Sequence, residues 1–285
     1  MADPAILALS ALNRLAHGRL LASDIPYGAH RRLRLDVYAP SGRPPFPALL
    51  YFYGGGWRSG CKEMYRFTGA AFAAAGFLTV IPDYRIYPEA GFPAFLEDCA
   101  AAVAWVRRNS ERYGADGAGP SVIGHSAGAY NAAMLALDAT WLGQCGLKPR
   151  TDLGPVIGLA GPYDFLPITG PTLKIIFGPE RQWPRTQPIR LVSGDNPPML
   201  LLAGGADRVV LAANSRRLAE RIRAAGGSAD ARLYRWTGHV GILGALAPQL
   251  RLLAPTFRDC VRFLGHDRIE AGDAGGWPDQ AALRA

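Results

Sequence analysis

The chain has 285 residues, a formal net charge of +8 and an apolar share of 49%, which suffices for the buried core of one large α/β domain or of two small ones. No apolar run approaches the roughly 20 unbroken residues of a membrane-spanning helix, so stable membrane insertion is not expected. The excess positive charge is arginine spread along the chain, without lysine-rich blocks or basic runs interleaved with aromatics, and no nucleic-acid partner is expected either.

The first 25 residues are expected to form an amphipathic segment on the surface of the domain. Leu7, Leu12 and Leu15 have the spacing of a short amphipathic helix. Asp3 stands where a signal peptide would carry basic residues, and Arg14 interrupts the apolar run. We therefore expect a cytoplasmic protein, with the periplasm as the alternative if a signal peptide has been removed.

From residue 26 to residue 265, strands and helices are expected to alternate. The first half contains predicted strands at Leu33–Tyr38, Ala48–Tyr53 and Phe77–Pro82, and predicted helices at Tyr65–Ala75 and Pro93–Tyr113. The second half contains predicted strands at Ser121–Gly124, Pro155–Leu159, Met199–Ala203 and Ala231–Tyr234, and predicted helices at Ala129–Leu137, at Ala212–Ala225 and before Leu264. This order predicts one α/β domain with a doubly wound, mostly parallel sheet flanked by helices, followed by a C-terminal tail over residues 266–285.

Residues 161–198 lie between two of these strands and are rich in proline, glycine and aromatic side chains. The segment is too long for an ordinary connection between a helix and a strand. We expect it to form a short lid or an elaborated loop, because loops at this edge of a sheet build ligand pockets.

The cysteines are scattered, with no C-x-x-C pair and no histidine at a spacing suited to zinc. We therefore expect free thiols, with neither a disulfide framework nor a metal site. The four residues are Cys61, Cys99, Cys145 and Cys260.

The most informative motif is G-x-S-x-G at residues 124–128, between an apolar strand and a predicted helix. This context matches a nucleophile elbow, in which the serine occupies a strained strand-to-helix turn and the flanking glycines avoid clashes. Ser126 is therefore the predicted nucleophile, with an ordinary turn and a capping serine as the alternative. The neighbouring His125 is expected to point away from the Ser126 hydroxyl and to serve as a packing residue.

A serine at its ordinary pKa is a poor nucleophile and needs a base, which in this kind of site follows it in the chain. Two histidines lie downstream of Ser126, namely His239 and His266. His266 opens the predicted tail, whereas His239 follows a predicted strand and precedes a helix. His239 is therefore the predicted general base.

An acid must orient the histidine, and it is expected on a turn after a strand that precedes the histidine. Asp207 fits because it ends a glycine turn after the apolar strand at residues 199–203. Asp164 and Asp195 are the competing candidates, for which surface solvation or turn capping is the expected role.

Three consecutive glycines, Gly54–Gly56, follow the strand at residues 48–53. Without β-carbons, such a run can turn its N–H groups inward as preorganised donors. Gly55 and Gly56, together with Ala127 after the nucleophile, are the predicted oxyanion hole. A flexible loop or a phosphate cradle is the alternative, but the run is not followed by the Lys-Ser/Thr of a P-loop and does not form G-x-G-x-x-G.

Together these motifs resemble those of the hormone-sensitive-lipase-like carboxylesterases and their kynurenine formamidase relatives, which are serine hydrolases of the α/β-hydrolase superfamily. The resemblance extends from about Tyr27 to Leu264, and its other parts are YGGGW at 53–57, DYR at 83–85 and FPA at 92–94. It implies the α/β-hydrolase fold and hydrolysis of small carboxylic esters, or of an arylformamide, with neither metal nor organic cofactor.

The chain departs from these enzymes at Tyr53, where they usually carry a histidine that braces the glycine loop. We expect Tyr53 to alter the support of the loop and the shape of the pocket rather than to abolish activity. Asp83, Tyr84 and Arg85 are expected to anchor a loop through hydrogen bonds.

Aromatic residues near the predicted site are candidates for a substrate pocket, with packing as the alternative role. They are Trp57, Tyr130, Tyr163 and Phe165.

The sequence therefore predicts a serine esterase that cleaves small ester substrates through an acyl-enzyme intermediate, with Ser126, His239 and Asp207 as its triad. An arylformamidase or small-amide hydrolase is the alternative within the hydrolases. A non-catalytic protein that binds a small hydrophobic ligand is the alternative outside them. The sequence leaves open whether the chain forms a homodimer.

Overall fold

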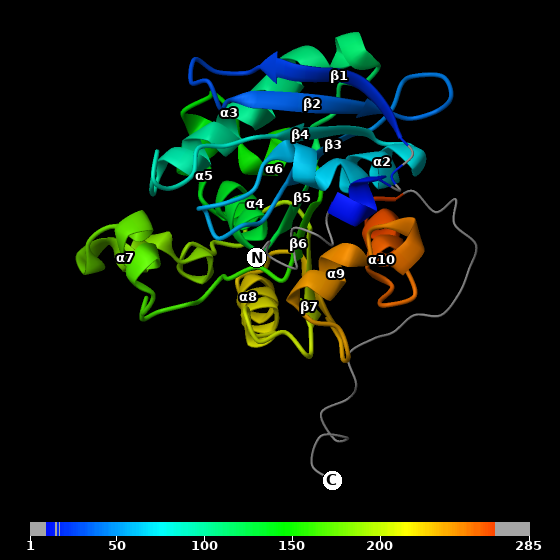
Figure 1. The fold of residues 1–285 in the computed structure, drawn as a ribbon. Helices are drawn as coiled ribbons and strands as arrows, with labels where there is room; N and C mark the ends of the chain where they lie inside the picture. Colours follow the sequence, from blue (N-terminus) through cyan, green and yellow to red (C-terminus); the bar gives the residue numbers. More distant parts are fainter. Residues whose placement is uncertain (1–9, 15, 17, 266–285) are drawn as a thin grey trace.

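The computed structural model describes residues 10–14, 16 and 18–265. Its centre is an eight-stranded sheet (Figure 1) with the strand order β1-β2-β4-β3-β5-β6-β7-β8. The strands are β1 (Arg19–Pro26), β2 (Arg34–Ala39), β3 (Ala48–Phe52), β4 (Leu78–Pro82), β5 (Ser121–His125), β6 (Val156–Leu159), β7 (Met199–Gly204) and β8 (Ala229–Tyr234). β2 pairs antiparallel with β1 and β4, and the other neighbours pair in parallel. The prediction of a mostly parallel sheet is confirmed.

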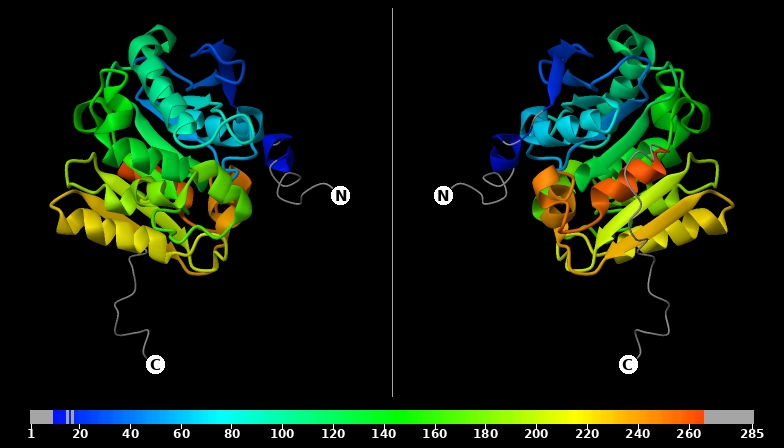
Figure 2. Two further views of the ribbon diagram at one scale, coloured as in Figure 1. Left: turned by 90° about the vertical axis from the view of Figure 1, so that its left-hand side faces the viewer. Right: turned by 90° about the vertical axis from the view of Figure 1, so that its right-hand side faces the viewer.

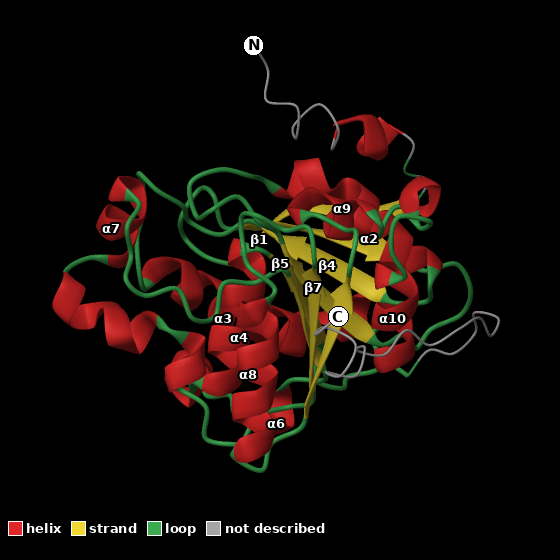
Figure 3. Cartoon of the chain, turned by 90° about the horizontal axis from the view of Figure 1, so that it is seen from below, coloured by secondary structure: helices red, strands yellow, loops and turns green. Residues whose placement is uncertain are grey.

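Helices cover both faces of this sheet. In Figure 3, α3, α4 and α8 lie on one face and α2, α9 and α10 on the other. The two views of Figure 2 show α8 in front in one and α10 in front in the other. The helices are α2 (Arg66–Ala74), α3 (Ala94–Asn109), α4 (Ala127–Leu137), α5 (Ala139–Gly143), α6 (Pro149–Asp152), α7 (Pro171–Phe177), α8 (Ala213–Ala224), α9 (His239–Gly244) and α10 (Thr256–Phe263).

The central strands are buried because both of their faces are covered. Every residue of β3, β6 and β7 is buried, as is β5 beyond its first residue. Their continuous apolar runs are typical of parallel strands between two helical layers. Since these strands run in the same direction, the loops that follow them gather at one edge of the sheet.

The predicted strands agree with the observed ones to within two residues at each end, but β1 was not predicted. We expected residues 1–25 to form an amphipathic segment, whereas residues 19–26 pair with β2 at the edge of the sheet. An edge strand with both faces partly exposed lacks the strict alternation that marks a half-buried strand. Residues 10–14 are helical and Leu12 is buried, while Leu7 and Leu15 lie outside the described residues.

Residues 161–198 form a set of short helices between β6 and β7. They comprise α7 and two 3₁₀ helices, η3 (Glu180–Thr186) and η4 (Pro188–Arg190). The predicted helix at Pro93–Tyr113 is observed as α3 followed by the 3₁₀ helix η2 (Ser110–Tyr113). The remaining 3₁₀ helices are η1 (Lys62–Tyr65) and η5 (Pro248–Leu250). The predicted C-terminal tail, residues 266–285, lies outside the described residues.

Within the part of the chain that the structure describes, no helix is long and apolar enough to cross a membrane. The same residues contain no cluster of three or more side chains suited to holding a metal ion. All four cysteines are free thiols, and Cys99 and Cys260 are buried.

Candidate active site

Ser126 lies at the sharp turn between β5 and α4. Its φ of 53° and ψ of −118° are a strained combination for a residue with a β-carbon. A β-carbon on Gly124 would lie 2.2 Å from the Gly128 carbonyl oxygen, and one on Gly128 would lie 2.1 Å from that of Phe52. Both flanking positions therefore accept only glycine, which is the local requirement of a nucleophile elbow.

A chain of hydrogen bonds connects Ser126, His239 and Asp207. His239 Nδ1 lies 2.7 Å from Asp207 Oδ2, and His239 Nε2 lies 2.9 Å from Ser126 Oγ. Because a carboxylate accepts, Nδ1 carries the proton in this arrangement, and Nε2 is free to accept from the serine hydroxyl. The structure thus brings together the three residues predicted as the triad from loops after β5, β7 and β8.

The Asp207 carboxylate is held in its ionised form. Burial alone would raise its pKa, but the hydrogen bond from His239 and those from the Val210 and Val209 N–H groups lower it. The two valine N–H groups donate to Asp207 Oδ1 at 2.9 and 2.8 Å, so both carboxylate oxygens are used. Of the competing acids, Asp164 instead pairs with Arg217 at 3.2 Å and Asp195 is exposed. His266 lies outside the described residues.

The His125 ring packs against that of His239, with 4.9 Å between the ring centroids. Its Nε2 lies 3.0 Å from the His239 carbonyl oxygen. Since a carbonyl oxygen can only accept, His125 Nε2 is the donor of this hydrogen bond. Burial, followed by the nearby His239, lowers the pKa of His125 to about 3. His125 is therefore a neutral residue that joins the turn carrying Ser126 to the loop carrying His239.

The glycine loop after β3 contacts the nucleophile directly. A β-carbon on Gly54 would lie 3.0 Å from Ser126 Cβ. Gly55 and Gly56 have φ values of 133° and 60°, and the next residue, Trp57, also has a positive φ of 57°. Gly56 and Ala127 line the same pocket as Ser126. Gly55 does not line that pocket, and its α-carbon faces Ser59, whose carbonyl oxygen would lie 2.1 Å from a β-carbon there.

Tyr53 supports this loop through a hydrogen bond and two stacked rings. Its hydroxyl donates to Asp83 Oδ1 at 2.6 Å, and its ring stacks between Tyr65 and Tyr84 at centroid distances of 5.2 and 4.8 Å. The Tyr84 hydroxyl donates to the Tyr53 carbonyl oxygen at 2.7 Å. Asp83 Oδ1 also accepts from the Lys62 N–H at 2.8 Å. The expectation that Tyr53 acts in loop support agrees with these contacts.

The residues after β4 also anchor loops, as expected. Burial raises the pKa of Asp83, although hydrogen bonds from Tyr53 and Lys62 oppose that rise. The Arg85 guanidinium forms a forked ion pair with Asp98 of α3, with nitrogen–oxygen distances from 2.7 to 3.0 Å. Such planar pairing fixes the orientation of both side chains.

A pocket of about 450 Å³ opens beside Ser126. Two of the four aromatic residues predicted for it, Trp57 and Phe165, line its wall. The other two, Tyr130 and Tyr163, are fully buried and do not line it. The pocket is lined by Gly56, Trp57, Arg58, Ser126, Ala127, Pro162, Phe165, Gly170, Pro171, Thr172, Leu173, Val209 and Val210.

Tyr130 does not line the pocket, but it holds the pocket residue Trp57 in place. Its ring meets that of Trp57 edge-on at 5.1 Å, and its hydroxyl donates to the Thr186 carbonyl oxygen at 2.8 Å. The Trp57 indole N–H donates to Asn131 Oδ1 at 3.0 Å. Trp57 is thereby held rigidly against the pocket.

Sequence reasoning missed the lining residues of α7 and of the loop after Asp207. Pro171, Thr172 and Leu173 belong to α7, about 45 residues from Ser126 in the chain, and they carry no motif. Val209 and Val210 closely follow Asp207, so their position beside the Ser126 pocket could have been inferred once Asp207 was predicted as the acid.

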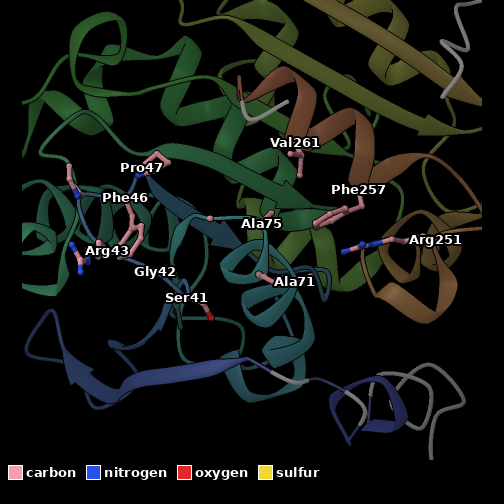
Figure 4. Close-up of a pocket in the computed structure, with 13 residues that line it drawn as sticks. Ser41, Gly42, Arg43, Phe46, Pro47, Ala71, Ala75, Arg251, Phe257 and Val261 are labelled. Carbon is pink, nitrogen blue, oxygen red and sulfur yellow. The ribbon is translucent and has the colours of Figure 1, made fainter. Parts of the chain in front are cut away.

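A larger pocket of about 650 Å³ lies elsewhere on the molecule (Figure 4). Its walls come from the connection between β2 and β3, the end of α2, and α10, with Phe46, Ala75 and Phe257 among them. None of Ser126, Asp207 and His239 lines it. The volume of a pocket therefore does not identify the candidate active site of this protein. The position of Ser126, hydrogen-bonded to His239, does.

The parallel sheet, the elbow after β5, the acid after β7 and the histidine after β8 define the α/β-hydrolase fold, which confirms the predicted fold class. Solved structures share this fold. A truncated carbohydrate esterase from gut microbiota aligns with a TM-score of 0.76 and 23% identity over 88% of this chain and 97% of that one. A hyperthermophilic esterase from Pyrobaculum calidifontis aligns with a TM-score of 0.73 and 20% identity over 92% and 90% of the two chains.

The chain belongs to the BD-FAE family, whose model matches residues 35–222. Esterase LipC of Mycobacterium tuberculosis is 27% identical over 217 residues, which are 70% of this chain and 54% of LipC. Kynurenine formamidase of Danio rerio is 31% identical over 146 residues, which are 51% of this chain and 47% of that protein. The matched region thus spans about half the length of these curated relatives.

Proposed function

We propose that the protein is a carboxylesterase-type serine hydrolase that cleaves small carboxylic esters. The observation that carries the proposal is the chain of hydrogen bonds from Asp207 through His239 to Ser126, at the edge of an apolar pocket. The family membership and the esterases among the relatives support the same reaction class.

In the proposed reaction, the Ser126 hydroxyl oxygen attacks the ester carbonyl carbon while His239 Nε2 takes the hydroxyl proton. Asp207 keeps the proton on Nδ1 and stabilises the imidazolium that forms. The tetrahedral intermediate collapses as the C–O bond to the alcohol breaks, and His239 returns the proton to the departing alkoxide. Water, deprotonated by His239, then attacks the acyl-enzyme and releases the carboxylic acid from Ser126.

The negative oxygen of the tetrahedral intermediate needs N–H donors. We assign this role to Gly56 and Ala127, with Gly55 as a positioning residue because it does not line the pocket. Gly56 and Ala127 border the same pocket as Ser126, and Ala127 opens α4, whose N-terminal dipole favours negative charge. Gly55 holds the turn that presents Gly56, because its carbonyl oxygen accepts from the N–H groups of Arg58 and Ser59.

Residues 161–198 are proposed as the segment that sets specificity. Phe165 and the α7 residues Pro171, Thr172 and Leu173 line the pocket beside Ser126. Because this segment is an insertion between β6 and β7, it can vary without disturbing the positions of the three reacting side chains.

An arylformamidase is the second candidate activity. Trp57 and Phe165 give the pocket two aromatic walls, against which an aryl group would pack. The kynurenine formamidase of Danio rerio among the relatives supports the same alternative. Comparing an aryl acetate with the matching N-formyl aniline, at equal concentration, separates the two activities.

Replacing Ser126 with alanine tests the proposed nucleophile. We expect kcat on p-nitrophenyl acetate to fall by at least ~10³-fold, because no other group supplies the attacking oxygen. Hydrolysis is followed by the release of p-nitrophenolate under saturating substrate. Ser121→Ala is the matched control, since Ser121 lies at the opposite end of the same strand and does not line the pocket.

Turnover of Ser126→Ala within a few-fold of the wild type would exclude the proposed mechanism. Circular dichroism of both variants shows whether the fold is retained. A loss of turnover in Ser121→Ala as large as that in Ser126→Ala would also contradict the assignment.

A further inference from the structure

The pocket beside Ser126 has mostly apolar walls and carries one charged side chain. Among the described residues that line it, Arg58 carries the only formal charge. The wall around it consists mainly of Trp57, Phe165, Leu173 and Val210. A substrate that enters this pocket therefore meets one guanidinium group on an otherwise hydrophobic surface.

The Arg58 side chain has no acidic partner in the described part of the chain. In contrast, Arg85 pairs with Asp98 at 2.7 Å and Arg232 pairs with Asp259 at 3.0 Å. The side chain of Arg58 forms neither an ion pair nor a hydrogen bond among the described residues, and its surface is exposed. Its donors are therefore available to a ligand.

The backbone at Arg58 is fixed, although its side chain is exposed. The Arg58 N–H donates to the Gly55 carbonyl oxygen at 3.2 Å, and the Tyr87 N–H donates to that of Trp57 at 2.8 Å. A β-carbon placed on Gly56 would lie 3.9 Å from Arg58 Nε. The guanidinium stem thus lies beside Gly56, close to where the ester carbonyl would bind.

A guanidinium group binds a carboxylate through two parallel hydrogen bonds. Apolar walls exclude water on one side, which strengthens such a contact compared with one on an open surface. We propose that Arg58 makes this site select esters that carry a carboxylate, placed either on the acyl chain or on the alcohol. This inference rests on the proposed hydrolase function.

The test uses matched ester pairs in which one member carries a carboxylate and the other a neutral amide. Monomethyl glutarate and methyl glutaramate place the group on the acyl side. The acetate esters of 3-hydroxybenzoate and 3-hydroxybenzamide place it on the alcohol side. For each pair, the ratio of kcat/KM, anionic over neutral, is measured for the wild type, for Arg58→Gln and for Arg58→Lys.

We expect a ratio of about 5-fold or more in at least one pair, which also shows the side on which the carboxylate binds. The ratio should fall to about 1 in Arg58→Gln, and Arg58→Lys should retain part of it because the charge remains but the planar fork is lost. Raising the salt concentration should lower the wild-type ratio. Arg43→Gln is the control, because Arg43 lies in the separate pocket of Figure 4 and its loss changes the net charge equally.

Three outcomes overturn the inference while leaving the proposed function intact. In the first, the wild type hydrolyses the neutral esters with no preference for either anionic partner. In the second, the preference persists in Arg58→Gln, and in the third it disappears equally in Arg43→Gln. Failure of the wild type to hydrolyse any of the four esters, or p-nitrophenyl acetate, would instead overturn the hydrolase function on which the inference rests.

Discussion

His125 occupies the position directly before Ser126, and burial keeps it neutral in the folded protein. Its pKa is lowered to about 3, whereas an exposed histidine titrates near pH 6.5. Its Nδ1 is buried and has no hydrogen-bond partner within the described residues. In the proposed mechanism, a proton taken up by the adjacent His239 therefore does not face a second positive imidazole.

This residue makes stability depend on pH in a defined window. Between about pH 3 and pH 6.5 the unfolded chain binds a proton at His125 that the folded chain does not, so stability falls as the pH decreases. The slope contributed by one such group approaches about 1.4 kcal/mol per pH unit. We expect denaturant titrations at pH 6.5, 5.5 and 4.5 to show a shallower decline for His125→Gln than for the wild type.

The titration of Asp207 does not affect this comparison of His125→Gln with the wild type. Its pKa is lowered in the folded protein, so its contribution is present above the pKa of an unfolded aspartate, near 4, and is lost only below it. Parallel pH dependence in His125→Gln and the wild type over the stated range would show that His125 does not titrate as described.

At the scale of elements, β3 presents two tyrosines whose hydroxyl groups differ sharply in environment. Tyr53, directly after the strand, donates to Asp83, while the Tyr51 hydroxyl is buried without a partner in the described residues. Removing a hydroxyl that satisfies a buried carboxylate costs more than removing one that satisfies nothing.

We therefore expect Tyr53→Phe to lower the free energy of unfolding by about 1–3 kcal/mol. Tyr51→Phe should leave it unchanged or raise it slightly. Both variants keep the ring and lose one oxygen, so urea denaturation of the pair isolates the hydrogen bond. Equal losses in the two variants would mean that ring packing, and not the bond to Asp83, stabilises the glycine loop.

The contacts of Tyr53 also show which structural features cannot be predicted from sequence patterns. The strand, the glycine run and the elbow were predictable, because each depends on residues that are adjacent in the chain. The partners of Tyr53 were not, since Asp83 and Tyr65 lie on other elements. β1 was missed for a related reason: its residues are fixed by pairing with β2 and not by their own alternation.

At the scale of the whole molecule, a buried lysine connects the antiparallel edge of the sheet to its parallel part. Lys62, in η1, is only 2% exposed, and its Nζ lies 2.8 Å from Asp24 of β1 and 3.0 Å from Asp36 of β2. Burial alone would lower the pKa of Lys62, but hydrogen bonds with Asp24, Glu63 and Asp36 raise it. The cluster thus stays charged and holds η1, β1 and β2 together.

Breaking this cluster should destabilise the fold. Lys62→Met leaves the buried Asp36 without its cation, and we expect the free energy of unfolding to fall by about 3–5 kcal/mol. Lys62→Met combined with Asp36→Leu should recover part of that loss. Arg31→Met, which removes the exposed pair with Glu89, is the control and should change stability by less than about 1 kcal/mol. A similar small change in Lys62→Met would contradict the assigned role.

All three triad residues could be predicted because the order of strands in an α/β sheet limits where each group can occur. The pocket could not, because its walls come from α7 and from the loop after Asp207, which meet only in the folded molecule. Gly55 is a second example. Its place in the glycine run could be predicted from the sequence, but its packing against Ser59, and not against the pocket, could not.

The three side chains of the candidate site are far apart in the chain, with 113 residues separating Ser126 from His239 and 32 separating Asp207 from His239. Each is carried by a different strand, and the glycine loop comes from a fourth. No proteolytic fragment that lacks one of these strands could therefore assemble the site. Turnover would then require β3, β5, β7 and β8 to be in place together, so that residual activity during denaturation counts the molecules in which this part of the sheet is intact.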